Sequence, residues 1–463
     1  MTIVNTPESN PVSKRAVLII STLASFITPF MFSSVNIALP AIGKRFSLDA
    51  VTLGWVASSY ILAAAMFLVP FGRLGDIHGR KRIFMLGIFT HTVTSIVVAM
   101  SNSTPLLISF RALQGIGGAM MFGTSVAILI SIFPASERGK VLGINVSFTY
   151  LGLSLGPTLG GLITQHFGWR YIFVLAALLG LLIAVIALWK LRGEWAEAKG
   201  EKFDFTGSII YGLGLLALMY GFTLLPTMPG VWLIIIGVIG VIAFIQWEMR
   251  IKSPILNINL FKNNPVFSFS NLAALINYSA TFAVGFLLSL YLQYIKGFSP
   301  SHTGLILVSQ PIIMASISPV AGRLSDRLEP RVISSIGMSL TTLGLILLTF
   351  LNNDTQLGYI LACLVTMGLG FGLFSSPNTN AALSSVEKKF YGVASGTLAT
   401  MRLIGQTLSL GIVMLLFTLH IGRVQITPEY YPLFLSSVKT AFITFTVLCF
   451  GGIYASLARG KTH

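Results

Sequence analysis

A short charged stretch, GRLGDIHGRKR, lies between two long apolar runs of the chain. It spans Gly72 to Arg82 and holds four Arg or Lys residues and one acid, Asp76. An aspartate in such a place accepts hydrogen bonds from a neighbouring helix N-terminus or pairs with nearby guanidinium groups, and charge strengthens either contact. We expect Asp76 to lock this side of the molecule in one state and to release it in another. The alternative is that the basic residues, Arg80 among them, only set the topology of the chain.

Two arginines lie inside apolar runs, where an ionised side chain is costly and normally faces protein or a water-filled cavity. They are Arg111 and Arg402. We expect both to take part in proton coupling or substrate contact, and we expect Gln114, one turn after Arg111, to share its face of a helix. The alternative for Arg111 is that it snorkels toward a membrane interface. His91 also lies inside a run, and we expect it to be a packed core side chain.

Acids are absent from the middle of every apolar run, although the chain has 14 Asp and Glu residues. A cavity with two arginines and no buried acid is electropositive. Such a cavity disfavours permanently cationic ligands and favours neutral, zwitterionic or anionic amphiphiles.

Uncharged polar side chains within the runs are further candidates for lining a cavity. In a membrane such groups need hydrogen-bonding partners, so we expect some of them to touch a ligand and the others to join neighbouring helices. With Gln114, these candidates are Asn36, Asn145, Tyr150, Asn277, Tyr278, Gln310 and Asn378.

The composition indicates which elements hold these residues. Hydrophobic residues make up 54% of the chain and charged residues 10%, and the mean hydropathy is +0.84, values far from those of soluble domains. Fourteen apolar runs are long enough to cross a bilayer as helices, which predicts an all-α polytopic membrane protein. The approximate runs are 16–39, 51–72, 83–101, 105–132, 139–164, 169–190, 206–225, 231–248, 267–293, 301–322, 332–351, 357–377, 391–419 and 436–457.

The net charge of +16 would suggest a nucleic-acid partner in a soluble protein, but its placement here indicates topology instead. With the N-terminus in the cytoplasm, 22 of the 30 Lys and Arg residues fall in cytoplasmic segments and six fall outside. This asymmetry is the positive-inside rule. It predicts that both termini and the loop from Lys190 to Lys202 face the cytoplasm. We expect no nucleic-acid partner.

An internal repeat divides the chain. Shifted by 250 residues, the segment from Gly72 to Asp76 lies over the segment from Gly322 to Asp326, and each follows one apolar run and precedes another. We interpret the repeat as two six-helix bundles, residues 1–200 and 256–463, with two inserted helices in residues 201–255.

Three motifs in order resemble the major facilitator superfamily, specifically its fourteen-span drug:proton antiporter branch. Residues 72–82 are similar to the signature between its second and third spans, 111–118 (RALQGIGG) to its fourth-span motif, and 152–161 (GLSLGPTLGG) to the fifth-span motif of antiporters. The resemblance implies conformational roles for Gly72, Asp76, Gly79, Arg80, Gly152, Gly156, Pro157, Gly160, Gly322 and Asp326. For the fifth-span residues the alternative is ordinary close packing of small residues.

One departure from the family concerns coupling. The family carries an Asp in the first span, where this chain has Met31. We nevertheless expect a proton-coupled exporter of amphiphilic small molecules, of the efflux or multidrug resistance type. We expect it to work by alternating access in a cell membrane, which in a prokaryote is the plasma membrane. We also expect a monomer that uses no cofactor or metal. The alternatives are a transporter of lipids or lipid-linked precursors with the same fold, a polytopic membrane enzyme, for which no HExxH motif is present, and a channel.

Overall fold

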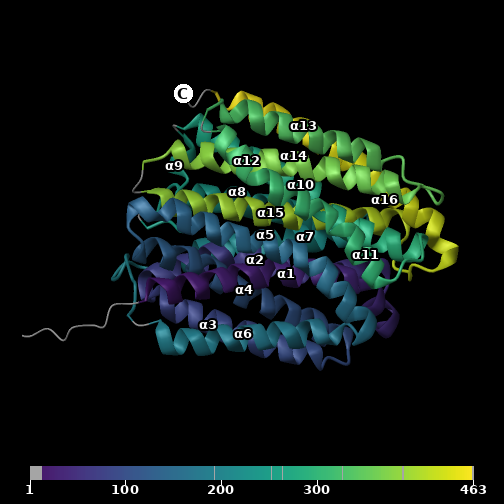
Figure 1. Ribbon diagram of the computed structural model, residues 1–463, viewed down its shortest axis with the longest axis horizontal. Coiled ribbons are helices and arrows are strands. Elements are labelled where there is room, and N and C mark those ends of the chain that lie inside the picture. The colour runs from purple at the N-terminus through teal and green to yellow at the C-terminus, as the bar shows by residue number, and fades with distance from the viewer. Residues whose placement is uncertain are drawn as a thin grey trace, which may run out of the picture.

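The computed structural model describes residues 13–460 apart from 192, 252, 263, 326, 388 and 389. Every regular element in these residues is a helix, and fourteen helical spans are long and apolar enough to cross a membrane (Figure 1). The prediction of an all-α polytopic protein with fourteen spans is confirmed.

The first eight spans are single helices. They are α1 (Lys14–Phe46), α2 (Ala50–His78), α3 (Arg80–Ala99), α4 (Thr104–Ile132), α5 (Ala135–His166), α6 (Arg170–Lys190), α7 (Phe205–Leu224) and α8 (Met228–Glu248). A short helix, α9 (Asn259–Lys262), then leads into the later spans.

Two of the remaining spans change their helical form partway. Helix α10 (Pro265–Leu290) continues as the π-helical turn η1 (Tyr291–Ile295), and α11 (Pro300–Leu307) and α12 (Ser309–Ser325) together make one span. The last spans are α13 (Pro330–Leu348), α14 (Leu357–Ser384), α15 (Tyr391–His420) and α16 (Tyr431–Ala458), which the 3₁₀ turn η3 (Pro428–Tyr430) precedes.

Helix starts are fixed by side chains that satisfy free backbone donors. The Asp49 carboxylate accepts from the backbone nitrogens of Val51 and Thr52, both at 2.9 Å, at the start of α2. Asp204 accepts from the nitrogen of Gly207 at 2.9 Å at the start of α7.

The helices form two groups, which we call the N-bundle (α1–α6) and the C-bundle (α10–α16). Figure 1 shows α3 and α6 on one side of the molecule and α13 and α14 on the other. Helices α7 and α8, which we call the inserted pair, pack against each other, and α7 also contacts α2 and α15. The domain boundaries at residues 200 and 255 remain our interpretation of the chain.

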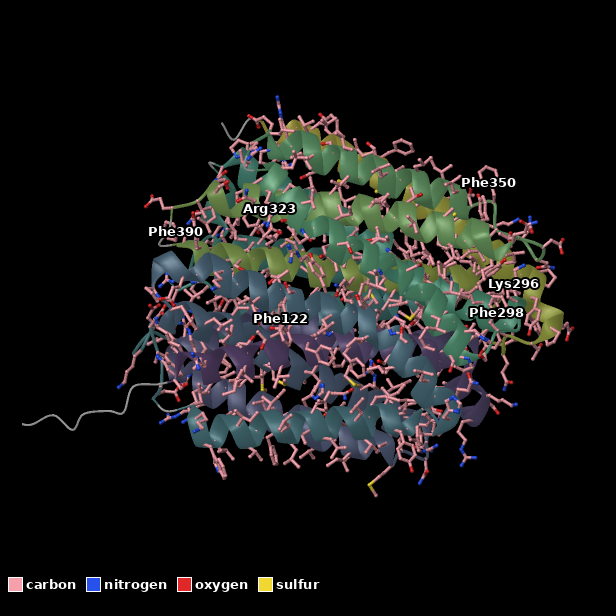
Figure 2. All side chains as sticks on the ribbon, viewed as in Figure 1. Phe122, Lys296, Phe298, Arg323, Phe350 and Phe390 are labelled. Atoms are coloured by element: carbon pink, nitrogen blue, oxygen red, sulfur yellow. The ribbon has the colours of Figure 1, made fainter. Side chains whose placement is uncertain are left out.

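The molecule has two distinct ends. We call the end that carries the C-terminus in Figure 1 the termini end, and the opposite one the far end. Phe390 lies toward the termini end, whereas Lys296, Phe298 and Phe350 lie at the far end (Figure 2). Because the number of spans is even, the first residue of α1 and the last of α16 belong to the same end.

Candidate functional site

The two bundles are joined at the far end by hydrogen bonds from α10 and η1 to α1. Ser289 Oγ donates to the carbonyl of Asn36 at 2.8 Å, and Gln293 Nε2 donates to the carbonyl of Ile37 at 3.0 Å. The rings of Phe32 and Phe282 stack beside them with centroids 4.1 Å apart. The loops add further links, including a 3.0 Å bond from the nitrogen of Ala50 to the carbonyl of Val424.

Small residues of α5 allow α1 to approach along this closed side. A Cβ on Gly152 would lie 2.4 Å from the carbonyl oxygen of Phe26, and one on Gly160 would lie 2.7 Å from Cα of Ser34. Ser34 Oγ donates to the carbonyl of Gly156 at 3.0 Å. The spacing of these glycines therefore permits backbone contact between the two helices.

Helix α5 also meets α11 across the bundle boundary. A Cβ on Gly304 would lie 2.1 Å from the carbonyl oxygen of Pro157, and one on Gly161 would lie 2.4 Å from that of Pro300. Contact with α12 is much sparser. A groove of about 350 Å³ separates α5 from that helix, and its lining residues are Ser147, Leu151, Ser154, Leu155, Val308, Ile312, Ala315 and Ser316. The bundles thus touch closely at the far end and part along α5 and α12.

Below the far-end contacts, side chains from four helices meet in what we call the central cluster. The hydroxyl groups of Tyr150 on α5 and Ser375 on α14 are 3.1 Å apart, which links the two bundles. Its other members are Thr379, Arg402, Tyr278 and Phe371, all from the C-bundle.

Arg402 holds the charge of the central cluster. One guanidinium nitrogen of Arg402 donates to Thr379 Oγ1 at 2.6 Å, and the guanidinium carbon lies 5.8 Å from the centre of the Tyr278 ring. The Tyr278 ring meets Phe371 edge-on at 5.2 Å. Arg402 Nε is buried and has no hydrogen-bond partner in the described residues, so one donor of this cation is free.

Three members of the central cluster were missed by the sequence analysis. Phe371, Ser375 and Thr379 follow one another at intervals of four residues on α14, which places them on one face of the helix. That spacing was the available signal. It is weak because small hydroxyl residues are common in membrane helices, where they bond to the preceding turn.

Arg111 occupies a different place, inside the N-bundle. It is fully buried, donates to Gln114 Oε1 at 2.7 Å and to the carbonyl of Val56 at 3.3 Å, and lies 4.7 Å from the centre of the Tyr60 ring. Gln114 in turn donates to Ser95 Oγ at 2.6 Å. The structure therefore does not bring Arg111 to Arg402, and their expected roles in coupling or substrate contact stay predictions.

The other polar candidates are spread over several contacts. Asn36, Asn145 and Asn277 are buried, and each has a side-chain oxygen without a hydrogen-bond partner in the described residues. Gln310 is half-buried on α12, where its carbonyl lies against Gly368 of α14. None of these four contacts the central cluster through a hydrogen bond found in the structure.

Asn378 ties together the termini end of the C-bundle. It donates to the carbonyl of Ser270 at 3.0 Å and accepts from Arg459 at 3.0 Å. Arg459 also donates to the carbonyl of Pro330 at 2.8 Å and is fully buried, and this burial lowers the pKa of its guanidinium to about 10. In the sequence Arg459 is one of the basic residues that fall in cytoplasmic segments, and nothing there indicates its burial.

The charged stretch at the termini end forms a network rather than a loose turn. Helix α2 continues through Gly72 and Gly75 to His78. Gly79, the residue after the helix, is the one glycine of this stretch with a positive φ, 115°. Asp76 pairs with Arg80 through Oδ1, at 2.8 Å from Nε and 2.7 Å from the terminal nitrogen. This is the guanidinium pairing that the sequence allowed.

Three acids of the loop after α6 complete that network, and the sequence analysis did not assign them a role. Glu197 accepts from Arg80 at 2.7 Å, Glu194 accepts from the backbone nitrogen of Lys81 at 2.8 Å, and Glu201 pairs with Arg73 at 2.5 Å. The hydrogen bond from Arg80 lowers the pKa of Glu197. We call this arrangement the loop clamp.

The half-repeat of this stretch in the C-bundle is only partly visible. Gly322 lies on α12, where a Cβ would meet Ser376 Oγ at 2.9 Å. Asp326 lies outside the described residues, so its expected gating role stays a prediction.

Comparison with known proteins identifies the family. A model of the Major Facilitator Superfamily matches residues 21–410. The riboflavin transporter RibZ of Clostridioides difficile (strain 630) is 32% identical over 84% of this chain and 85% of its own. The multidrug resistance protein Stp of Mycobacterium tuberculosis (strain CDC 1551 / Oshkosh) is 30% identical over 82% of this chain and 71% of its own. The tetracenomycin C resistance and export protein of Streptomyces glaucescens is 27% identical over 84% and 73%.

A solved structure shares the fold. A bacterial homolog of the human lysosomal transporter Spinster, in an inward-facing and unoccupied conformation, has a TM-score of 0.71 over 97% of both chains at 15% identity. With fourteen spans in the described residues and relatives named as transporters and exporters, the chain belongs to the Major Facilitator Superfamily and fits its fourteen-span branch.

Proposed function

We propose that this protein exports amphiphilic small molecules across a bacterial plasma membrane in exchange for protons. The N- and C-bundles would move alternately around the central cluster, with the termini end in the cytoplasm. The observation that carries the proposal is the link between Tyr150 and Ser375, which places the cluster where the two bundles meet, beneath their far-end contacts.

The chemistry of the central cluster supports a particular class of substrate. Arg402 offers a free donor, and Tyr278 and Phe371 offer aromatic surfaces beside it. A guanidinium binds carboxylate or phosphate groups, while aromatic rings accept flat apolar groups. Neutral, zwitterionic or anionic aromatic amphiphiles fit this combination better than permanently cationic dyes do.

The loop clamp supports a gating role for the charged stretch. Arg80 connects Asp76 on α2 with Glu197 in the loop that leads to the inserted pair. A movement of α2 relative to that loop would have to break or stretch these ion pairs. The clamp would therefore stabilise the present arrangement, which is closed at the far end.

The decisive experiment is transport in proteoliposomes with and without an imposed pH gradient. Riboflavin, a flat heteroaromatic compound suggested by the name of one relative, would be tested beside an anionic aromatic dye and a dicationic dye. We expect the gradient to drive accumulation of the first two in the direction of export. Arg402→Ala should abolish this accumulation, and Arg423→Ala, which removes an exposed arginine in the loop after α15, should not. Gradient-driven transport of the dicationic dye that survives Arg402→Ala would refute the proposal.

The second candidate is a transporter of lipids or lipid-linked precursors. The groove between α5 and α12 favours it, because Leu151, Leu155 and Ile312 in its lining are exposed, and a membrane would place acyl chains beside them. A fluorescent phospholipid added to the same proteoliposomes separates the two candidates. Protein-dependent movement of the lipid between leaflets, without transport of the soluble compounds, would favour the second.

A further inference from the structure

Two carboxyl groups lie side by side where the inserted pair meets the termini end. Asp204 precedes α7 and Glu248 ends α8, and their exposed fractions are 5% and 2%. A Cβ on Gly207 would lie 2.1 Å from Asp204 Oδ2 and 2.7 Å from Glu248 Oε1, so these two oxygens are at most 4.8 Å apart, the sum of the two distances. Neither acid lies in the middle of an apolar run, so the sequence alone does not single them out.

The hydrogen bonds of the two carboxyl groups are unequal. Asp204 accepts from the nitrogen of Gly207 at 2.9 Å and from the indole nitrogen of Trp247 at 3.0 Å. Glu248 Oε2 accepts from the nitrogen of Leu256 at 2.8 Å. Its other oxygen, Oε1, is buried beside Asp204 and has no partner in the described residues.

No described cation balances this pair within ion-pair distance. Arg73 of α2 pairs with Glu201, while Lys202 and Arg250 next to the two acids in the chain are exposed. Tyr211, the titratable neighbour on α7, donates its hydroxyl to the carbonyl of Ala65 on α2. Lys252 lies outside the described residues.

Two ionised carboxylates cannot occupy this place at low free energy. Each would lose its hydration, and the two charges would repel at short range. A single proton on Glu248 Oε1 removes both problems, because it neutralises one group and turns the unpartnered acceptor into a donor that faces Asp204. Asp204 already accepts hydrogen bonds from two nitrogen donors, so we place the proton on the unpartnered oxygen of Glu248.

We propose that Asp204 and Glu248 form a proton-binding site that holds one proton between them and latches the linker after α8. The latch is the bond from the nitrogen of Leu256 to Glu248, which holds Leu256 against the inserted pair. Leu256 and Ile255 are buried there with Tyr211 and Phe244. The same linker continues through α9 into the C-bundle.

The sign of the pH dependence follows from this arrangement. With the proton bound, the pair carries one negative charge, and the bond from Leu256 to Glu248 holds the linker. When the proton leaves to water, Glu248 becomes charged beside Asp204 and moves toward solvent, which releases Leu256. The latch is therefore closed at low pH and opens as the pH rises. This inference goes beyond the proposed export function and requires no substrate.

Trp247 reports on the site directly, because its indole donates to Asp204. The purified protein in nanodiscs would be titrated by tryptophan fluorescence, and the signal of Trp247 isolated as the difference between the wild type and Trp247→Phe. We expect a one-proton transition that disappears in Glu248→Gln and in Asp204→Asn. It should persist in the control Glu137→Gln, which removes an exposed acid paired with Lys14.

Two measurements keep the test independent of any single variant. An infrared difference spectrum of the wild type should show a protonated carboxyl band at low pH that is lost over the same pH range. The rate of thiol labelling at Asn257→Cys should rise severalfold across the transition and stay low when Glu248→Gln is added. This rate is divided by that of the exposed reference Ser103→Cys, which removes the pH dependence of the thiol itself.

Three results would overturn the proposal. The first is a transition of Trp247 that survives both substitutions of the pair. The second is the absence of a protonated carboxyl band at any pH in a folded protein. The third is loss of the transition in Lys252→Gln, which would show that a lysine rather than a proton balances the two acids.

Discussion

Helix α5 carries two glycines that should respond to the same substitution with opposite signs. A Cβ on Gly152 would lie 2.4 Å from the backbone oxygen of Phe26, whereas one on Gly143 would meet nothing within 4 Å. Ordinary contact begins at 3.4 Å, so Gly152→Ala requires α5 and α1 to separate by about 1 Å. Overpacking of this kind costs about 1–3 kcal/mol, and the gain from replacing a helical glycine is about 0.5–1 kcal/mol.

We therefore expect Gly152→Ala to destabilise the protein by about 1–2 kcal/mol and Gly143→Ala to stabilise it by about 0.5–1 kcal/mol. Both free cysteines, Cys363 and Cys449, are buried. A dye that fluoresces on reaction with thiols follows their exposure during thermal unfolding in detergent. The melting temperature should fall for Gly152→Ala and rise for Gly143→Ala.

Equal shifts for the two variants, or a rise for Gly152→Ala, would refute the packing argument. The same variants also test the antiporter-like motif. If close packing is its whole role, export per folded molecule should be unchanged in Gly152→Ala. A loss of export that exceeds the loss of folded protein would assign the motif a part in the conformational change.

Four further predictions concern the charged groups. Asp76→Asn should remove a charge-assisted contact to Arg80 worth about 1.5 kcal/mol and so shift the equilibrium between the two conformations about tenfold. Distances between spin labels on the two bundles would detect this shift. An unchanged distribution of these distances would mean that the charged stretch serves topology alone. Arg402→Ala should abolish export of anionic substrates, and Arg402→Lys should restore it only partly because an ammonium lacks the planar fork of a guanidinium; full activity of Arg402→Ala would contradict this. Arg111→Ala should lower the melting temperature, because Gln114 then loses its buried partner, and an unchanged melting temperature would contradict that reason. The pKa of Glu197 is lowered in the folded protein, so its pairing with Arg80 stabilises the fold fully above the ordinary pKa of 4.5, and this stabilisation is lost as the pH falls through the lowered pKa. The difference in stability between the wild type and Glu197→Gln should therefore vanish at low pH. A difference that persists at low pH would exclude the ion pair as its cause.

The number of spans, the membrane environment and the family could be predicted from the sequence, since each rests on local properties of the chain. Hydrophobic length predicts a span whatever that span packs against, because the alternative solvent for an exposed backbone is lipid. The glycine spacing on α5 is local as well, and it predicted a close helix contact.

Partnership between distant residues was decided by the tertiary structure alone. Arg111 and Arg402 have the same side chain in similar apolar surroundings, yet one is enclosed in the N-bundle and the other lies where the bundles meet. Their environments depend on which helices surround each position, and helix packing joins segments far apart in the chain. No local pattern specifies that choice.

The acids show the same limit most clearly. Nothing in the sequence distinguishes Glu197 from Glu248, because both lie outside the middle of any apolar run. In the folded chain Glu197 is paired with Arg80 more than a hundred residues earlier, while Glu248 is buried against Asp204 because α7 and α8 pack with these two ends together. The sequence determined that these carboxyl groups exist near the membrane surface. Only the packing of the helices decided whether each meets a cation, water or a second carboxyl group, and that surrounding sets whether it holds a charge or a proton.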